Sequence, residues 1–422
     1  MNPEPITTPR YAVLLLICCG VVLGCYFGTY MRFPVVPLYA LSLGADTVMV
    51  GLINAAFLLS AGALSLPLGL VVHRLGMKLL AGAGLLILAA SSFLLAVSST
   101  PHQLLWIYLF SGAGLAAFGP TTMSYVAGIS PPTHLGRSYG WYTTALYVGM
   151  SLGPAAGGFV AEAWGFSLVF ILSGLSIFVT FWIMFFFLPR ARHVMPASPR
   201  LPAMGKTVIR EVGKNQPLLG AWLATGGGCF GVGVFLTYLP LHAHAQGLTY
   251  GQIGLVFAVQ GVMNAVSRLP FGHLSDRVKR RTLLVVWGLL GVAASLAGYG
   301  LSRQPLHFIL CAVAMGFSMG LTFTSVAALC VETVPPEHRS IAMGGYNSAI
   351  YLGMMVSAAG LGPIIGIIGF KDGFLLTTLI TLLLTGIAFL LMKNFSPPPL
   401  GPPAAASPPG STGDPPLPRG PA

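Results

Sequence analysis

The chain has 422 residues, and only 7% of them are Asp, Glu, Lys or Arg, whereas soluble domains carry about 25% charged residues. Hydrophobic residues make up 55%, which excludes a soluble enzyme, a disordered chain and a nucleic-acid-binding domain. The formal net charge of +12 is concentrated between apolar stretches, which is typical of a protein whose partner is a lipid bilayer and not a nucleic acid.

Long stretches without a charged residue predict the membrane spans, because a spanning helix needs about 20 mostly apolar residues. The first stretch lacks a small-residue cleavage site, so it is expected to stay as a helix and not to be removed as a signal peptide. The sequence predicts an all-α membrane protein with twelve transmembrane helices. In chain order they span 11–40, 48–72, 79–98, 104–128, 138–162, 166–189, 217–241, 250–274, 282–301, 306–330, 341–368 and 373–393.

The Lys and Arg residues between these helices predict the orientation. With the N-terminus inside, 17 of the 21 basic residues fall on the cytoplasmic side, and only Arg303 and Lys371 fall outside. Positive residues favour the cytoplasmic side. We therefore expect a multi-pass protein of the plasma membrane, the inner membrane in a bacterium, with both termini in the cytoplasm.

The spacing of the helices also predicts the domain organisation. A cytoplasmic N-terminus (1–10) precedes a six-helix half (11–189), and a basic linker (190–216) leads to a second half (217–395). The last segment (396–422) holds 11 prolines in 27 residues, which predicts a disordered cytoplasmic tail. The cysteines and acidic residues show no metal-ligand spacing, so we expect no metal and no cofactor.

Four sequence similarities, in the same order and at nearly one offset, relate the two halves. Gly69–Arg74 matches Gly272–Arg277 at an offset of 203, and Ala145–Met150 matches Ala349–Met354 at 204. Pro131-Pro132 and Gly165-Phe166 recur in the same way as Pro335-Pro336 and Gly369-Phe370. Membrane proteins built from such repeats are typically transporters, with the substrate site between the halves.

At this point the sequence resembles the major facilitator superfamily. The loop after 48–72 matches that family's signature, except that His73 replaces an aspartate, and the second copy keeps its aspartate. The resemblance implies a major facilitator fold with two pseudo-symmetric halves, and it assigns the two loops to a cytoplasmic gate. The gating residues are Gly69, His73, Arg74, Gly76 and Lys78 in the first copy, and Gly272, Asp276, Arg277, Arg280 and Arg281 in the second.

The helices at 11–40 and 138–162 resemble the twelve-helix drug and metabolite exporters of that family. The first carries a Gly-x5-Pro-Val-x-Pro pattern from Gly28 to Pro37. The second matches the family's antiporter motif, which implies efflux over uptake and a helix that packs closely and bends during gating. The motif residues are Gly149, Gly153, Pro154, Gly157 and Gly158.

Two features depart from that branch. These exporters often carry an arginine before the Gly-x-Gly of the fourth helix, and Tyr108 stands there. No Asp or Glu lies in the core of any predicted helix, so proton antiport lacks the usual carboxylate. Facilitated diffusion, anion-linked coupling and coupling through a gate histidine remain alternatives.

Two arginines are predicted to lie inside the membrane, where an ionisable residue is costly and often functional. Arg32 is expected either to attract an anionic or polar substrate, or to reach the outer interface or pair with Asp46 or another helix end. Arg268 shares one helical face with Gln260 and Asn264, and this stripe is similar to the acid–arginine pair of monocarboxylate transporters, with Asn264 in place of the acid. The alternative for Arg268 is pairing at the gate.

The sequence therefore predicts a monomeric secondary transporter that moves a small organic molecule by alternating access, with efflux favoured over uptake. Transport of an organic anion through Arg32 and Arg268 is the alternative. A membrane-embedded enzyme is disfavoured because no buried His/Asp/Glu constellation is present, and a receptor is disfavoured by the internal repeat and the gate loops. The cavity is expected between the helices at 11–40, 104–128, 217–241 and 306–330 and their partners at 48–72, 138–162, 250–274 and 341–368. Candidate cavity residues are Tyr30, Arg32, Asn54, Tyr147, Gln260, Asn264, Arg268, Ser318, Thr322 and Tyr351.

Overall fold

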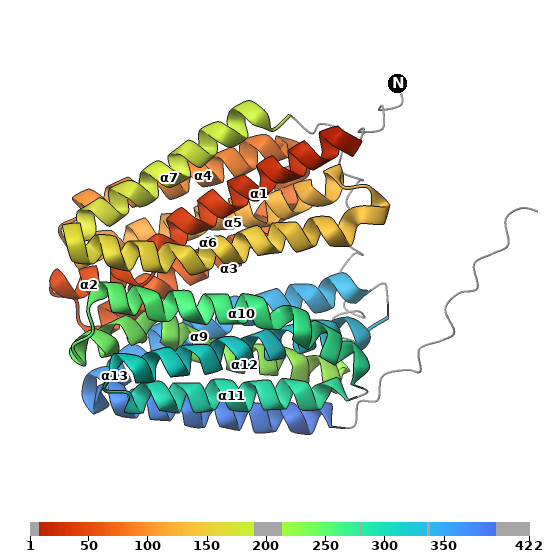
Figure 1. The fold of residues 1–422 in the computed structure, drawn as a ribbon. Helices are drawn as coiled ribbons and strands as arrows, with labels where there is room; N and C mark the ends of the chain where they lie inside the picture. Colours follow the sequence, from red (N-terminus) through yellow and green to blue (C-terminus); the bar gives the residue numbers. More distant parts are fainter. Residues whose placement is uncertain (1–7, 190–212, 279, 336–337, 394–422) are drawn as a thin grey trace, which may run out of the picture.

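The computed structural model describes residues 8–189, 213–278, 280–335 and 338–393. All long elements are helices that run side by side between two ends of the molecule, in two groups (Figure 1). The first group comprises α1 (Thr8–Met31), α2 (Val35–Ser42), α3 (Thr47–Leu75), α4 (Met77–Val97), α5 (Pro101–Ile129), α6 (Leu135–Trp164) and α7 (Phe166–Phe187). The second comprises α9 (Gln216–Ala245), α10 (Tyr250–Arg277), α11 (Arg281–Leu301), α12 (Pro305–Glu332) and α13 (Arg339–Met392).

The number of membrane spans follows from helix length. In the described ranges, 11 helices are long and apolar enough to cross a membrane, and the last, Ile341–Met392, has 52 residues. That helix contains a break at Gly369, whose φ of +84° is readily adopted only by glycine. Since about 20 residues cross a bilayer, it makes two crossings. The prediction of twelve spans in an all-α membrane protein is therefore confirmed.

The predicted first helix, over 11–40, is interrupted in the structure. Residues 32–34 form a turn in which the Arg32 carbonyl accepts hydrogen bonds from the amides of Val35 and Val36, at 3.1 and 2.9 Å. Pro34 and Pro37 have no amide hydrogen, so the helical ladder is weakest here. The continuous helix was wrong at this point, and the break places the Arg32 side chain toward α4 and α5.

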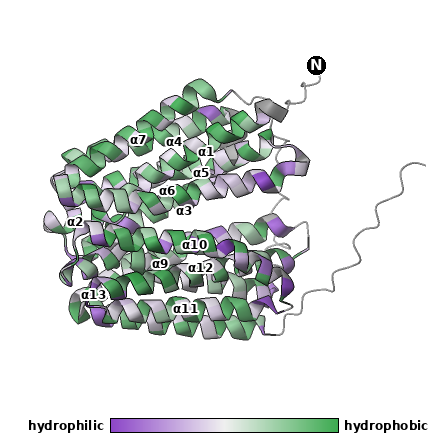
Figure 2. Ribbon diagram, in the orientation of Figure 1, coloured by the Kyte–Doolittle hydropathy of each residue, from purple (hydrophilic) through white to green (hydrophobic). Residues whose placement is uncertain are grey.

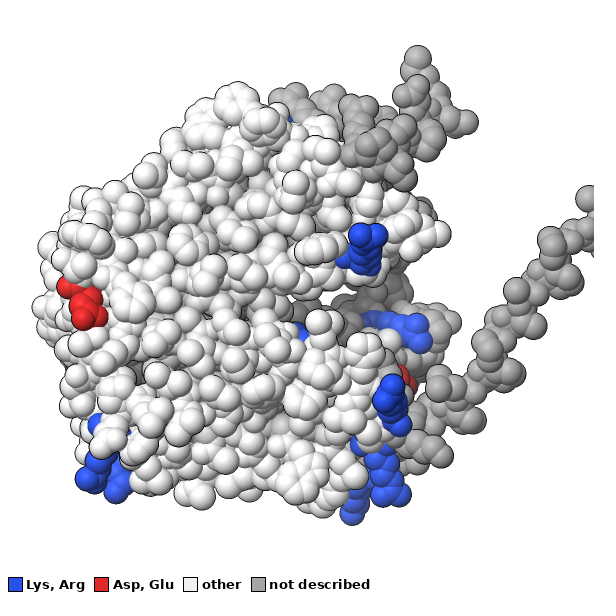
Figure 3. Space-filling view, viewed as in Figure 1, with Lys and Arg blue, Asp and Glu red and all other residues white. Residues whose placement is uncertain are grey.

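Hydrophobic residues run along most of every helix, whereas hydrophilic residues gather at the two ends (Figure 2). Lys and Arg gather mainly at one end, which we call the basic end and which carries the first turns of α4, α6, α11 and α13 (Figure 3). The opposite end carries α2 and the acidic residues Asp46, Glu162 and Asp372. The predicted N-terminal segment, linker and tail lie almost entirely outside the described residues.

Candidate functional site

A cavity of about 1340 Å³ separates the two halves and opens at the basic end (Figure 3). Its walls come from α1, α3, α5 and α6 of the first half and from α10 and α13 of the second. The spans at 217–241 and 306–330, which correspond to α9 and α12, were expected to contribute but supply none of the described lining residues. They lie behind α10 and α13 and pack against them.

Two of the cavity's described walls are related by the internal repeat. On α6, Thr143, Thr144 and Tyr147 line the cavity, and at an offset of 204 the equivalent Asn347, Ser348 and Tyr351 line it from α13. Tyr147 and Tyr351 were candidates from the sequence, whereas Asn347 and Ser348 were not. Applying the offset to the threonines that precede Tyr147 would have found them.

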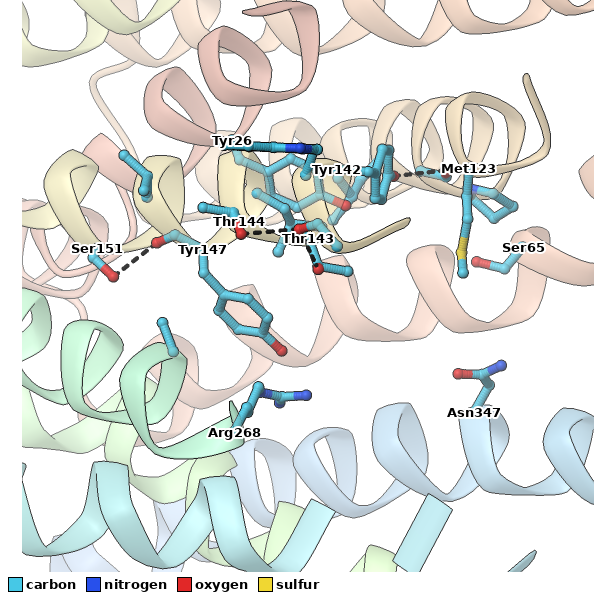
Figure 4. Close-up of a pocket in the computed structure, with 18 of the residues that line it drawn as sticks. Tyr26, Ser65, Met123, Tyr142, Thr143, Thr144, Tyr147, Ser151, Arg268 and Asn347 are labelled. Carbon is cyan, nitrogen blue, oxygen red and sulfur yellow. Dashed lines mark hydrogen bonds between the residues drawn. The ribbon is translucent and has the colours of Figure 1, made fainter. Parts of the chain in front are cut away.

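Arg268 projects into the cavity from α10, and Tyr147 projects toward it from α6 in the other half (Figure 4). The guanidinium carbon of Arg268 lies 4.5 Å from the centroid of the Tyr147 ring, within the range of a cation–π interaction. The Nε–H of Arg268 donates to Asn264 Oδ1 at 3.3 Å. These contacts hold the guanidinium in one orientation between the halves.

Only three of the ten candidate cavity residues, Tyr147, Arg268 and Tyr351, line the described cavity. Asn264 is buried behind Arg268, and Gln260 donates to the sulfur of Met319 at 2.9 Å. The remaining five are not among the described lining residues. Tyr30 stacks on Phe33, Ser318 and Thr322 pack against glycines of α11, Asn54 is buried, and so is Arg32.

Arg32 is 1% exposed and lies in the interior of the first half. Its Nη1 donates to Ser91 and Ser92 at 3.1 Å each, and its Nη2 donates to Ser111. The guanidinium carbon lies 5.8 Å from the ring centroid of Tyr108. Tyr108 stands at the position where the exporters that this chain resembles often carry an arginine. Neither the cavity nor Asp46 is its partner in this conformation, because the turn at residues 32–34 directs the side chain inward.

Replacing Arg32 with methionine is expected to lower the free energy of unfolding by only about 1 kcal/mol. An apolar chain of similar size can replace a buried charge at little cost, but the buried Ser111 loses its described hydrogen-bond partner. Ser91 and Ser92 keep their hydrogen bonds to the Leu88 carbonyl. Arg32→Ala also leaves a cavity and should lose about 3 kcal/mol. Thermal unfolding of both purified variants measures the difference, and a loss as large in Arg32→Met as in Arg32→Ala contradicts this account.

The antiporter-motif glycines of α6 face two different neighbours. Gly149, Gly153 and Gly157 lie against the backbone of α1, so that an added Cβ would come within 2.9 Å of backbone atoms there. Gly158 and Pro154 instead meet α10 of the other half, at Tyr250 and Gly254. One face of α6 therefore packs against α1 within the first half, and another face packs against α10 of the second half.

Direct contacts between the halves close the cavity at the opposite end. The Thr47 hydroxyl of α3 donates to the Gly362 carbonyl of α13 at 2.8 Å. The backbone amide of Gly251 at the start of α10 donates to Glu162 Oε2 of α6 at 2.8 Å, where a carboxylate also favours the positive end of the helix dipole.

At the basic end, the described contacts of the two signature loops stay within one half. Lys78 donates to the Leu188 carbonyl at 2.8 Å, and Arg281 pairs with Glu332 at 2.9 Å and donates to the Ser275 carbonyl at 3.1 Å. Gly76 joins α3 to α4 with a φ of +80°, which explains a glycine there. The side chains of His73, Arg74 and Asp276 lie outside the described residues, and a gating role for the loops stays a prediction.

Comparison with known proteins agrees with this architecture. The profile described as Major Facilitator Superfamily matches residues 18–250 and 222–419. An uncharacterized transporter of this type from Methanocaldococcus jannaschii is 22% identical over 362 residues, covering 86% of this chain and 93% of the relative. The multi-drug resistance efflux pump PmrA of Streptococcus pneumoniae is 25% identical over 354 residues, covering 82% of this chain and 88% of the pump.

Solved structures show the same fold. A bacterial homolog of the human lysosomal transporter Spinster, in an inward-facing and unoccupied conformation, superposes with a TM-score of 0.75 at 13% identity, over 92% of this chain and 98% of that one. The nucleoside transporter NupG superposes with a TM-score of 0.73 at 12% identity, over 90% of this chain and 99% of that one. The chain belongs to the Major Facilitator Superfamily and is a multi-pass secondary transporter, not an enzyme.

Proposed function

We propose that this protein exports a small organic molecule from the cytoplasm by alternating access, as a monomer in the plasma membrane. The cavity between the halves carries the proposal, because it is open at the basic end and closed at the other. The excess of Lys and Arg favours a cytoplasmic location for the basic end and for both termini. The open cavity is then positioned to load substrate from the cytoplasm.

Outward transport is supported by the close packing of the antiporter motif and by distant relatives whose names describe efflux. Gly158 of that motif lies at the contact between the halves that must open to release substrate outside. PmrA and the multidrug efflux protein YfmO of Bacillus subtilis, 27% identical over 334 residues, are efflux proteins by name. Residues of the cavity wall, among them Tyr147, Arg268 and Tyr351, are proposed to contact the substrate.

A facilitator without proton antiport is a second candidate, because no carboxylate lies among the described residues of the cavity wall. Glu332 pairs with Arg281 at the basic end, and the carboxylates of Asp46 and Glu162 lie at the opposite end. A proton-coupled exporter normally needs a carboxylate in the path.

Everted vesicles, whose cytoplasmic face points outward, are expected to accumulate a labelled substrate when they contain this chain. Accumulation above the bath concentration under an imposed proton gradient supports coupled export, whereas equilibration that ignores the gradient supports a facilitator. A cysteine in place of the exposed Arg303 should react with an impermeant maleimide in intact cells, and one in place of Arg137 should react only after the cells are opened. The reverse labelling pattern would overturn the orientation.

A further inference from the structure

The polar groups of the cavity wall carry a positive charge without a described counter-charge. Arg137 and Arg268 line the cavity, and no Asp or Glu does so among the described residues. Arg137 is exposed near the mouth, where water solvates it, whereas Arg268 lies deeper and is half-buried. A guanidinium at such a depth is costly unless an anion or a polar partner balances it.

The described partners of Arg268 leave most of its hydrogen-bonding capacity unused. Its Nε–H donates to Asn264, a neutral amide, and its face lies on the Tyr147 ring. Neither Nη1 nor Nη2 has a hydrogen-bond partner among the described residues. These two nitrogens present the planar pair of donors that binds a carboxylate, sulfonate or phosphate in a bidentate manner.

The equivalent position in the first half of the internal repeat carries no charge. At the offset of 203 that relates the signature loops, the position equivalent to Arg268 in the first half is Ser65, which also lines the cavity. At the depth of Arg268 the described charge therefore lies on the α10 wall, whereas Arg137 of α6 lies near the mouth. The facing walls carry Tyr26, Trp141, Tyr147 and Tyr351, whose rings are suited to the apolar part of a ligand.

We propose that the substrate is a small amphipathic organic anion whose oxyanion binds the Nη atoms of Arg268 while its aromatic or apolar part packs against Tyr147. This assignment rests on the proposed transport function and names its substrate class. A cavity of about 1340 Å³ accommodates such a molecule, since ligand sites usually measure about 300–1,000 Å³. Because Arg268 and Tyr147 belong to opposite halves, an anion held between them contacts both halves at once.

Three probes with the same ring system test the charge preference: 1-naphthoate, 1-naphthylmethylammonium and 1-naphthalenemethanol. We expect isothermal titration of the detergent-purified chain to show the tightest binding for naphthoate. Arg268→Ala should weaken naphthoate binding by about tenfold to a hundredfold, the range for a lost hydrogen bond to a charged group. The affinity for the neutral alcohol should change far less.

Asn264→Asp is the most selective variant, because it places a carboxylate oxygen where the amide oxygen now accepts from Arg268. The side chain keeps its shape, but the positive charge is balanced from within the protein, so naphthoate binding should fall at least tenfold. Arg303→Ala removes an exposed positive charge at the opposite end and is the control for net charge. Tyr147→Leu removes the aromatic ring that faces Arg268 and should weaken naphthoate binding.

Equal binding of the three probes, a preference for the ammonium compound, or absence of naphthoate binding overturns the anion assignment. So does full naphthoate affinity in Asn264→Asp. Flux measurements in vesicles distinguish a wrong substrate class from a failure of the transport proposal itself. Binding and movement of the ammonium compound refute only the anion class, whereas a bound probe that never crosses the membrane refutes transport.

Discussion

Gly158→Ala is expected to leave the chain folded but to prevent closure of the end opposite the basic one, and so to abolish transport. In the structure, a Cβ at this position would overlap the Tyr250 carbonyl oxygen and lie 3.0 Å from Gly254 Cα. Both atoms belong to α10, in the other half. The clash exists only when this end is closed. It therefore destabilises the conformation that is open at the basic end, and not the folded state as a whole.

The expected size of the effect follows from the cost of overpacking, which is about 1–3 kcal/mol. Applied to one side of a two-state equilibrium, about 2.7 kcal/mol shifts the populations about a hundredfold. The substrate site of the variant would then face away from the basic end most of the time. Substrate could no longer load from the side on which the cavity opens.

Spin labels at Ser99 and Arg303, exposed in different halves at the opposite end, report this shift by double electron–electron resonance. The distance between the labels should lengthen in Gly158→Ala. Gly360→Ala is the matched control, because an added Cβ there has no atom within 4 Å. An unchanged distance together with normal flux would show that the contact between α6 and α10 does not control closure.

Gly157→Ala, one residue earlier, is expected to destabilise the protein in every conformation. A Cβ on Gly157 would overlap the Met31 carbonyl oxygen and lie 2.8 Å from the Met31 carbonyl carbon. α1 and α6 belong to the same half and pack along their length. Rocking of the halves therefore cannot relieve the clash, and we expect a loss of about 3 kcal/mol, at the upper end of overpacking costs.

Thermal unfolding of the two purified variants distinguishes these roles. Gly157→Ala should unfold at a clearly lower temperature than the parent chain, and Gly158→Ala should unfold close to it. Gly360→Ala serves again as the control for adding a methyl group to a helical glycine. An equal decrease in unfolding temperature in both variants, or a Gly157→Ala variant as stable as the parent chain, would contradict these separate roles of the two glycines.

The candidate site was only partly predictable, and the three residues of the α10 stripe show why. Helical spacing correctly placed Gln260, Asn264 and Arg268 on one face, because residues four apart lie above one another. Only Arg268 lines the cavity, however, since α12 covers the other end of this face, where Gln260 contacts Met319. The packing of neighbouring helices determines which part of a polar stripe is exposed to water. The sequence of the stripe itself does not specify that packing.

The partners of Arg32 were even less predictable from the sequence. Its depth in the membrane was evident from the apolar residues around it, but its partners Ser91, Ser92 and Ser111 are 59, 60 and 79 residues away in the chain. The turn at residues 32–34 determines that the side chain points into the first half and not into the cavity. No local pattern specifies both that turn and those three hydroxyls.

The sequence by itself determined the twelve spans, the two related halves and the family resemblance. Those properties depend on hydropathy, charge and repeated motifs, which can be read from the sequence. A membrane span needs only about 20 consecutive apolar residues, and its orientation follows from the basic residues that flank it. Only the tertiary structure decided which end is open, which glycine of Gly157-Gly158 faces the other half, and that Arg268 lies over Tyr147. Each of these depends on packing between helices distant in sequence, where a single helical face has several possible neighbours.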